Sequence, residues 1–167
     1  MNAWTIHNML SQDRYTRQHF QGFSTPDVPL PPFKKTPTLF ILNIDNSGGP
    51  GIHWCAAFFN ANECDFFDPL GNPPDTYNFQ HALFEKCSKI NFNREAVQAS
   101  NSSTCGHHCV FFAYHRSRNV SSSDIMKKYK TRNCVWNDHM VNSFIHNHFG
   151  YEYAKITRAQ PRFMYKN

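Results

Sequence analysis

Four side chains between positions 53 and 105 could together perform nucleophilic chemistry. Cys105 follows the polar run "ASNSST" and opens a helical pattern, so the sequence predicts a helix N-terminus at this cysteine. The exposed N–H groups and the macrodipole of a helix start lower the pKa of a thiol, and the thiolate is the nucleophilic form. Gly106 comes next, where a residue without a side chain would let a substrate backbone approach closely.

His53 and Asp68 are suitable partners for such a thiolate. They border two apolar runs, which the short link "NAN" predicts to pair as an antiparallel hairpin. The two polar ends would then meet at one sheet edge, where imidazole can accept a proton and a carboxylate can fix its tautomer. Gln98 lies seven residues before Cys105 and could donate a side-chain N–H to an oxyanion.

The motifs "GIHW", "FFDPLG" and "VQASNSSTCGHHC", in this order, resemble those of adenain, the maturation protease family of adenoviruses. That family is part of a wider group of cysteine proteases that includes the SUMO and ubiquitin-like deconjugating enzymes. The resemblance runs from about position 19 to about position 114 and is weaker in the C-terminal third. It implies that Cys105 is the nucleophile and His53 the general base. It also implies that Asp68 orients His53, where many adenoviral enzymes have Glu, and that Gln98 completes the oxyanion hole with the Cys105 N–H.

The same resemblance implies a thiol endopeptidase that cleaves viral capsid and core precursors after small residues during virion maturation, in the host nucleus and the virion. Trp54 and Gly106 would line the substrate cleft, although Trp54 could equally be a core residue. Cys87 matches the cysteine that forms a disulfide with an activating viral peptide in adenoviral enzymes. It could instead be a core thiol, because the chain is shorter in the C-terminal part, where much of the peptide groove would lie. No small-molecule cofactor is implied, only this peptide and DNA.

The composition favours one globular domain over residues 1–167, active as a monomer. Sixteen Phe, seven Tyr and three Trp predict an aromatic interior. No run approaches the roughly 18–20 apolar residues of a membrane span, and the N-terminus lacks the pattern of a secretory signal. We therefore expect an intracellular protein that is not secreted, in which the six cysteines are free thiols, metal ligands or a nucleophile rather than disulfides.

The formal net charge of +5 is unevenly distributed. Between positions 116 and 132 a single acid, Asp124, accompanies six basic residues, which are Arg116, Arg118, Lys127, Lys128, Lys130 and Arg132. Such a patch is most often a solvated face. It could also bind DNA, because each neutralised phosphate releases condensed counterions.

The pattern of elements predicts an α+β fold with a central, mostly antiparallel sheet flanked by helices. Five prolines exclude regular structure from the connector 25–37, and "NSGGPG" at 46–51 is a loop. Strands are predicted at 38–44, 52–59, 63–68, 90–92 and 95–98. Helices are predicted at 4–10, at 78–87, from 105 onward, within 121–129 and at 137–149, the last ending before Gly150. In this fold the nucleophile would lie at the N-terminus of a core helix, as in permuted papain-like enzymes, which the resemblance also implies.

Three other interpretations compete. The cluster "CGHHC" at 105–109 could ligate zinc, but structural zinc sites usually pair two ligand groups, and no second group has that spacing. A protease of this group could instead be an isopeptidase that removes ubiquitin or a ubiquitin-like modifier. The chain could also be a non-catalytic nucleic-acid-binding protein, although such a module would not need the set of His53, Asp68, Gln98 and Cys105.

Overall fold

The structure is a computed structural model that describes residues 1–33, 37–49 and 51–150. Its strands are β1 (Phe20–Ser24), β2 (Thr38–Asn43), β3 (Trp54–Asn60), β4 (Glu63–Phe67) and β5 (Lys89–Phe92). Its helices are α1 (Ala3–Gln12), α2 (Gln80–Phe84), α3 (Cys105–Arg116), α4 (Ser122–Met126) and α5 (Cys134–Phe149), with short 3-10 helices η1 (Thr16–Gln18) and η2 (Pro74–Tyr77).

The five strands form one sheet in the order β1-β2-β3-β4-β5. The central pairs β2–β3 and β3–β4 are antiparallel, whereas the edge pairs β1–β2 and β4–β5 are parallel. Each parallel pair is joined by a long connection rather than a tight turn, as parallel pairing requires. The predicted α+β class with a helix-flanked sheet is confirmed, and its antiparallel part is the centre of the sheet.

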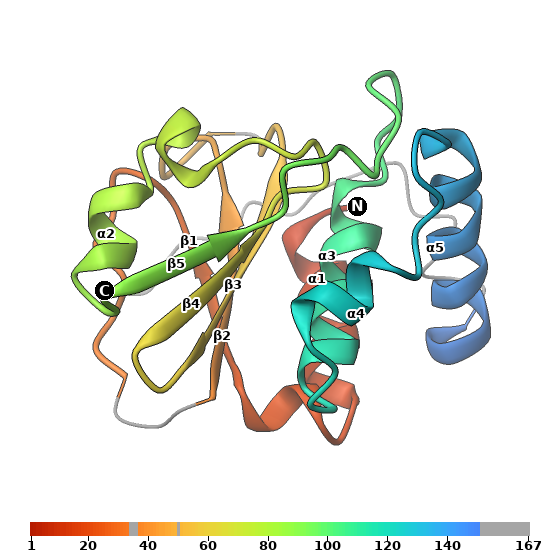
Figure 1. Ribbon diagram of the computed structural model, residues 1–167. Coiled ribbons are helices and arrows are strands. Elements are labelled where there is room, and N and C mark those ends of the chain that lie inside the picture. The colour runs from red at the N-terminus through yellow and green to blue at the C-terminus, as the bar shows by residue number, and fades with distance from the viewer. Residues whose placement is uncertain (34–36, 50, 151–167) are drawn as a thin grey trace.

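Helices cover both faces of the sheet (Figure 1). Alternate strand residues belong to the separate cores on its two sides. Leu39 and Ile41 of β2 pack in the core beneath α1, α3, α4 and α5, while Phe40 and Leu42 pack in a second core with α2. Both faces of β2 are therefore buried, which explains why its sequence is continuously apolar rather than alternating. Within the described residues, no helix is long and apolar enough to cross a membrane.

The predicted β3–β4 hairpin is confirmed, and its register places the ends of both strands together. Asn60 pairs with Glu63, so the link consists of Ala61, at a φ of 49°, and Asn62. His53 immediately precedes β3 and Asp68 immediately follows β4. Both residues consequently lie at the end of the hairpin opposite its turn.

Three predicted elements differ in extent or type. The segment 95–98 is not a strand, because the backbone N–H groups of Val97 and Gln98 both donate to the Pro69 carbonyl, at 2.8 and 3.0 Å, instead of to a neighbouring strand. Helix α2 is shorter than predicted, and α5 begins three residues earlier, at Cys134. The described parts of 25–37 and 46–51 contain no helix or strand, and positions 34–36 and 50 lie outside the described residues.

Candidate active site

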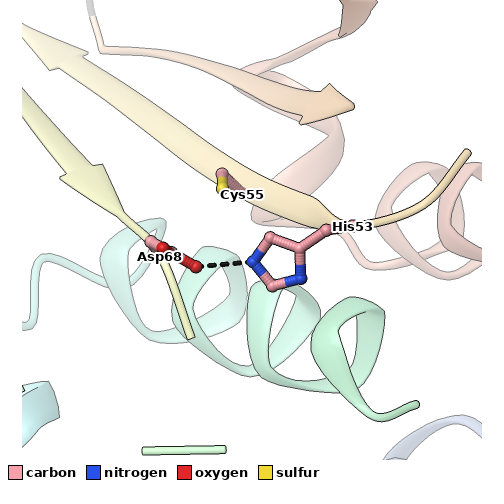
Figure 2. Close-up of side chains that lie close together, drawn as sticks. All are labelled: His53, Cys55 and Asp68. Atoms are coloured by element: carbon pink, nitrogen blue, oxygen red, sulfur yellow. Dashed lines mark hydrogen bonds and ion pairs between the residues drawn. The ribbon is translucent and has the colours of Figure 1, made fainter. Parts of the chain in front are cut away.

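The end of the β3–β4 hairpin holds a buried histidine–carboxylate pair. The Nε2 atom of His53 lies 2.6 Å from Oδ1 of Asp68, and the two residues are 6% and 0% exposed. Figure 2 shows the imidazole turned with this nitrogen toward the carboxylate. The ring nitrogen that remains, Nδ1, is therefore the one available to a nucleophile.

Local donors fix the Asp68 carboxylate. Its Oδ1 accepts from the Leu70 N–H at 2.9 Å, and its Oδ2 accepts from the N–H and side-chain amide of Asn72 and from the Tyr77 hydroxyl, each at 3.0 Å. The turn that follows Asp68 thus hydrogen-bonds back to it, which is the usual behaviour of Asp before Pro-x-Gly. Burial would raise the pKa of Asp68, but the bonds from His53 and from this turn outweigh burial and lower it.

Cys105 is the first residue of α3, as predicted, and it is 7% exposed. Burial would raise the pKa of its thiol, but a hydrogen bond with His53, the charge of that ring and the Trp54 backbone N–H together lower it. Burial likewise would lower the pKa of His53, but hydrogen bonds with Asp68 and Cys105 raise it to about 9. These opposite shifts favour the thiolate form of Cys105 and the protonated form of His53.

Gln98 lies in the segment between β5 and α3 and is buried, at 5% exposed. Its backbone N–H donates to the Pro69 carbonyl at 3.0 Å, which ties it to the residue that follows Asp68. Its side-chain Nε2 donates one hydrogen to the Ser102 carbonyl at 2.9 Å. A carboxamide nitrogen carries two hydrogens, so Gln98 retains one for a further acceptor.

Gly71 explains how the Gln98 segment comes so close to Asp68. Its φ is +77°, and a Cβ placed on it would lie 2.6 Å from the Glu95 carbonyl carbon and 2.7 Å from the Ala96 nitrogen. Only glycine adopts this conformation without strain and leaves room for the neighbouring backbone. The "DPLG" sequence therefore orients the carboxylate and also admits the segment that carries Gln98.

The two residues predicted to line the cleft pack against the N-terminal part of the chain. Trp54 is 7% exposed, contacts the Phe23 ring, and donates its indole N–H to the Met1 carbonyl at 3.0 Å. A Cβ on Gly106 would lie 3.0 Å from Met1 Cβ and 3.2 Å from Ile6 Cδ1. Packing against the N-terminal part of the chain thus accounts for the burial of both residues, and their contact with substrate stays a prediction.

A further thiol, that of Cys55, lies close to the histidine–carboxylate pair. Ligand atoms of His53, Cys55 and Asp68 fall within 4.8 Å of one another (Figure 2). These three form the only group of at least three potential metal ligands among the described residues. Cys55 is fully buried, and burial first, with the Asp68 charge second, raises its pKa. His53 and Asp68 already hydrogen-bond to each other, at 2.6 Å, so this pair is held together by its own contact.

The cluster "CGHHC" does not converge on one point. The Cys109 thiol donates to the Trp54 carbonyl at 3.2 Å, and His108 Nε2 lies 2.8 Å from Asp138 Oδ1. His107 is 8% exposed, and neither of its ring nitrogens has a hydrogen-bond partner among the described residues. Burial lowers its pKa to about 3, so this ring is neutral.

All six cysteines lie in the described part of the chain and carry free thiols. Cys87, which the resemblance links to an activating peptide, is buried in the core beside α2 at 5% exposed. A hydrogen bond from Cys64 lowers the pKa of Cys87 to about 7, while burial raises that of Cys64. Cys87 is therefore both a core thiol, the alternative considered from sequence, and a readily ionised one.

The six basic residues of 116–132 do not form one free surface. Arg116 forms an ion pair with Asp65 at 2.9 Å, and Arg118 one with Asp13 at 2.6 Å. Lys127 pairs with the exposed Asp124, three residues earlier, and Lys130 lies over the Trp136 ring. The two arginines thus stabilise the fold, and a role of this segment in DNA binding stays a prediction.

Comparison with known proteins identifies the family. The model of a family described as adenovirus endoprotease matches residues 18–163. The chain belongs to the adenovirus endoprotease family. A protease of Bovine adenovirus 7 is 32% identical over 89 residues, which cover 44% of this chain and 44% of that protein. The matched range also spans His53, Asp68, Gln98 and Cys105, whose catalytic roles stay a prediction.

Two solved structures are also similar. The ASFV pS273R protease is 17% identical, with 83% of this chain and 66% of that chain covered and a TM-score of 0.47. Its selenomethionine form is 24% identical, with 60% and 43% covered and a TM-score of 0.36. The chain therefore spans less than half the length of the adenoviral relative and about two thirds of the length of the ASFV protease.

Several residues of the site were not predicted from sequence. Asn72 and Tyr77 hold Asp68, and their position four and nine residues after it could have suggested contact with the "DPLG" turn. Asp138 accepts from the Ala99 N–H, directly after Gln98, and from the Thr104 hydroxyl, directly before Cys105. No local sequence signal marks Asp138, because it approaches from a helix more than 30 residues further along the chain.

Proposed function

We propose that the protein is a thiol endopeptidase of viral precursor proteins, with Cys105 as nucleophile and His53 as general acid and base. The observation that carries this proposal is the buried pair of His53 and Asp68, with Nε2 2.6 Å from Oδ1, together with Cys105 as the first residue of α3. In this site the pKa of the imidazole is raised to about 9 and that of the thiol is lowered. The lowered pKa favours the thiolate as nucleophile, and the raised pKa of His53 favours a protonated acid in the same site.

The reaction follows from these positions. The Cys105 thiolate adds to the scissile carbonyl carbon, and the carbonyl electron pair moves to oxygen. Gln98 Nε2–H and the Cys105 backbone N–H donate to this oxyanion. The C–N bond then breaks as His53 protonates the leaving amine, which leaves a thioester and a neutral imidazole. His53 removes a proton from water, the resulting hydroxide attacks the thioester, and the acid product and the thiolate–imidazolium pair are released. Asp68 keeps the ring oriented throughout.

The family suggests the substrate class. Proteases of adenoviruses are the named relatives, so we expect precursors of capsid and core proteins, cleaved after small residues during virion maturation in the host nucleus and the virion. An isopeptidase acting on ubiquitin-like modifiers would use the same four residues. The two differ in substrate, and this difference is measurable.

The test is a panel of fluorogenic peptides with a scissile bond after Gly-Gly or Gly-X, together with ubiquitin and SUMO adducts. We expect turnover of the peptides that is lost in Cys105→Ala and in His53→Ala. The matched control is Cys64→Ala, which removes a buried thiol at the far end of the β3–β4 hairpin and should leave turnover intact. Peptide cleavage by Cys105→Ala protein would exclude the mechanism, and turnover of the adducts alone would favour the isopeptidase.

We further propose that a viral peptide activates the enzyme through Cys87, whose lowered pKa of about 7 favours thiol–disulfide exchange. Oxidised glutathione can serve as the probe. We expect a mixed disulfide at Cys87, located by mass spectrometry, that forms faster than one at Cys134, a more exposed thiol. Preferential modification of Cys134 would contradict this assignment.

A DNA cofactor is proposed on the same family grounds, with Lys127, Lys128, Lys130 and Arg132 as the contacting residues. Turnover should rise on addition of DNA and the effect should decline with salt, since binding releases counterions. Turnover that is unchanged by DNA at low salt would exclude this role.

A further inference from the structure

A second buried histidine–carboxylate pair lies outside the catalytic constellation. His108 of α3 places Nε2 2.8 Å from Oδ1 of Asp138, a residue of α5. His108 is fully buried and Asp138 is 8% exposed. The other ring nitrogen of His108 lies 3.3 Å from the Tyr129 hydroxyl. Polar groups this deep between helices are kept only where each has its partners.

The Asp138 carboxylate binds both ends of the segment that joins Gln98 to Cys105. Its Oδ2 accepts from the Ala99 N–H at 3.3 Å, and Ala99 directly follows Gln98. Its Oδ1 accepts from the Thr104 hydroxyl at 2.8 Å, and Thr104 directly precedes Cys105. Because one rigid carboxylate holds both ends, it fixes the distance across the segment.

The inside of the segment continues this network. Thr104 gives its hydroxyl hydrogen to Asp138, so in the 2.9 Å contact between the hydroxyls of Thr104 and Ser102 the donor is Ser102. The carbonyl of Ser102 accepts from Gln98 Nε2 at 2.9 Å. Ser102 therefore links the two ends: its hydroxyl bonds to Thr104, which bonds to the carboxylate on α5, and its carbonyl bonds to the carboxamide of Gln98.

Thr104 also differs from an ordinary helix cap. It is the N-cap residue of α3, where a threonine side chain usually accepts from an N–H of the first turn, yet it makes no such bond. Its hydroxyl points instead to Asp138 as a donor. The Thr104 side chain consequently does not occupy the first N–H groups of α3, which lie beside Cys105 where an oxyanion would need donors.

We propose that Asp138, supported by His108, is a positioning residue that holds the 98–105 segment in the shape of an oxyanion hole. The proposal rests on the endopeptidase function proposed above. It gives α5 a role in catalysis, since any displacement of this helix moves the carboxylate and, with it, both ends of the segment. The C-terminal part of the chain would thereby act on the chemistry without contacting substrate.

The test compares two reactions of the same thiol in Asp138→Ala, Asp138→Asn and Thr104→Val. Peptide turnover needs the oxyanion hole, whereas alkylation of Cys105 by iodoacetamide is a direct displacement that needs only the thiolate. We expect kcat on a Gly-Gly fluorogenic peptide to fall at least about tenfold in Asp138→Ala, below the roughly 10²–10³-fold cost of deleting an oxyanion donor outright, with KM within about twofold. The alkylation rate of Cys105 should remain close to that of the wild type.

The three variants should rank by the contacts they lose. In Asp138→Asn one oxygen can still accept from Thr104 and His108, but an amide would face the Ala99 N–H, donor against donor, so the loss should be smaller than in Asp138→Ala. Thr104→Val keeps the side-chain shape and removes the donor to Asp138 together with the acceptor for the Ser102 hydroxyl. If Asp138→Ala does not fold, Thr104→Val tests the same hydrogen bond by removing its donor instead of its acceptor.

A matched control and an independent readout separate the possible failures. Asp13→Asn weakens another half-buried ion pair, with Arg118, and should lower the melting temperature without changing kcat. Hydrogen exchange at Ala99 should accelerate in Asp138→Ala and stay slow in the control. Folded variants with wild-type kcat, a parallel loss of alkylation, or unchanged exchange at Ala99 would each overturn the positioning role. An inactive wild-type protein whose Ala99 exchange still depends on Asp138 would count against the peptidase function alone.

Discussion

The Nε2 atom of His53 lies 2.6 Å from Asp68 Oδ1, and this contact decides which nitrogen of the imidazole remains for the proposed nucleophile. With Nε2 bound to the carboxylate, Nδ1 is left for the Cys105 thiol. The carboxylate itself accepts four hydrogen bonds from the turn and η2 that follow it, so it cannot rotate away. The orientation of the base is therefore set by Asp68 and its turn.

The first prediction concerns pH. The active form has Cys105 as thiolate and His53 protonated, so turnover should rise with pH as Cys105 ionises below its ordinary value of 9.0 and fall as His53 deprotonates at about 9. Replacing Asp68 by Asn removes the charge that opposes the effect of burial. The alkaline limb should then move below about 9, and kcat should fall, although less than in His53→Ala.

The measurement is kcat/KM for peptide hydrolysis and the alkylation rate of Cys105, both followed from about pH 5 to 10. Because the pKa of His53 is raised in the folded state, its contribution to stability is complete below pH 6.5 and disappears as pH rises through about 9. A single ionisation of Cys105 near its ordinary pKa, unchanged in His53→Ala, would contradict the ion pair.

The second prediction concerns Gln98. Gln98→Ala should lower kcat on the order of 10²–10³-fold with little effect on KM, because the lost N–H acts on charge that develops only in the transition state. Gln98→Glu keeps the shape but replaces the donor by an acceptor, and should be at least as damaging. Cys105 alkylation serves as the control for an intact nucleophile. A rise in KM at constant kcat would assign Gln98 to substrate binding instead.

The third prediction concerns Gly71, which lies outside the reacting groups. Gly71→Ala should lower the free energy of unfolding by about 2–4 kcal/mol, because a Cβ would meet the backbone of 95–96 as well as strain a positive φ. It should also lower kcat, since that backbone carries Gln98. Gly48→Ala is the control: its φ is +93°, but nothing lies within 4 Å of an added Cβ, so it should cost only about 1–2 kcal/mol. Equal losses in both variants, with unchanged kcat, would refute the role of the close approach.

Much of the candidate site was predictable because its chemistry is carried by short local patterns. The hairpin that brings His53 toward Asp68 followed from the two apolar runs and the link between them, and the antiparallel pairing is confirmed. Cys105 at a helix start followed from the polar run before it, and the helix boundary is confirmed. The polar run did not reveal that Thr104, the N-cap residue of α3, donates its hydroxyl to Asp138 of α5.

The remaining differences arise from contacts between distant segments. The strand predicted at 95–98 is absent because the Pro69 carbonyl takes two of its N–H groups, a competition that local β propensity does not reveal. The parallel pairing of β1 with β2 and of β4 with β5 depends on the path of the long connections that join them, not on the strands' own residues. Asp138 and His108 meet only because α3 and α5 pack against each other, so no spacing in the sequence announces them.

The last prediction distinguishes basic residues that stabilise the fold from those free to bind a polyanion. Arg116 is paired with Asp65 at 2.9 Å, donates to the Val120 carbonyl at 2.8 Å, and lies 4.4 Å from the centre of the Phe58 ring. Removal of its charge in Arg116→Met leaves Asp65 mostly buried without that partner, so urea denaturation should show a loss of about 2–4 kcal/mol. Lys128→Met, in the same segment, should change stability by less than about 0.5 kcal/mol and instead weaken DNA binding at low salt. If Arg116→Met proved as stable as Lys128→Met, the arginine would belong to the surface patch and not to the core of the fold.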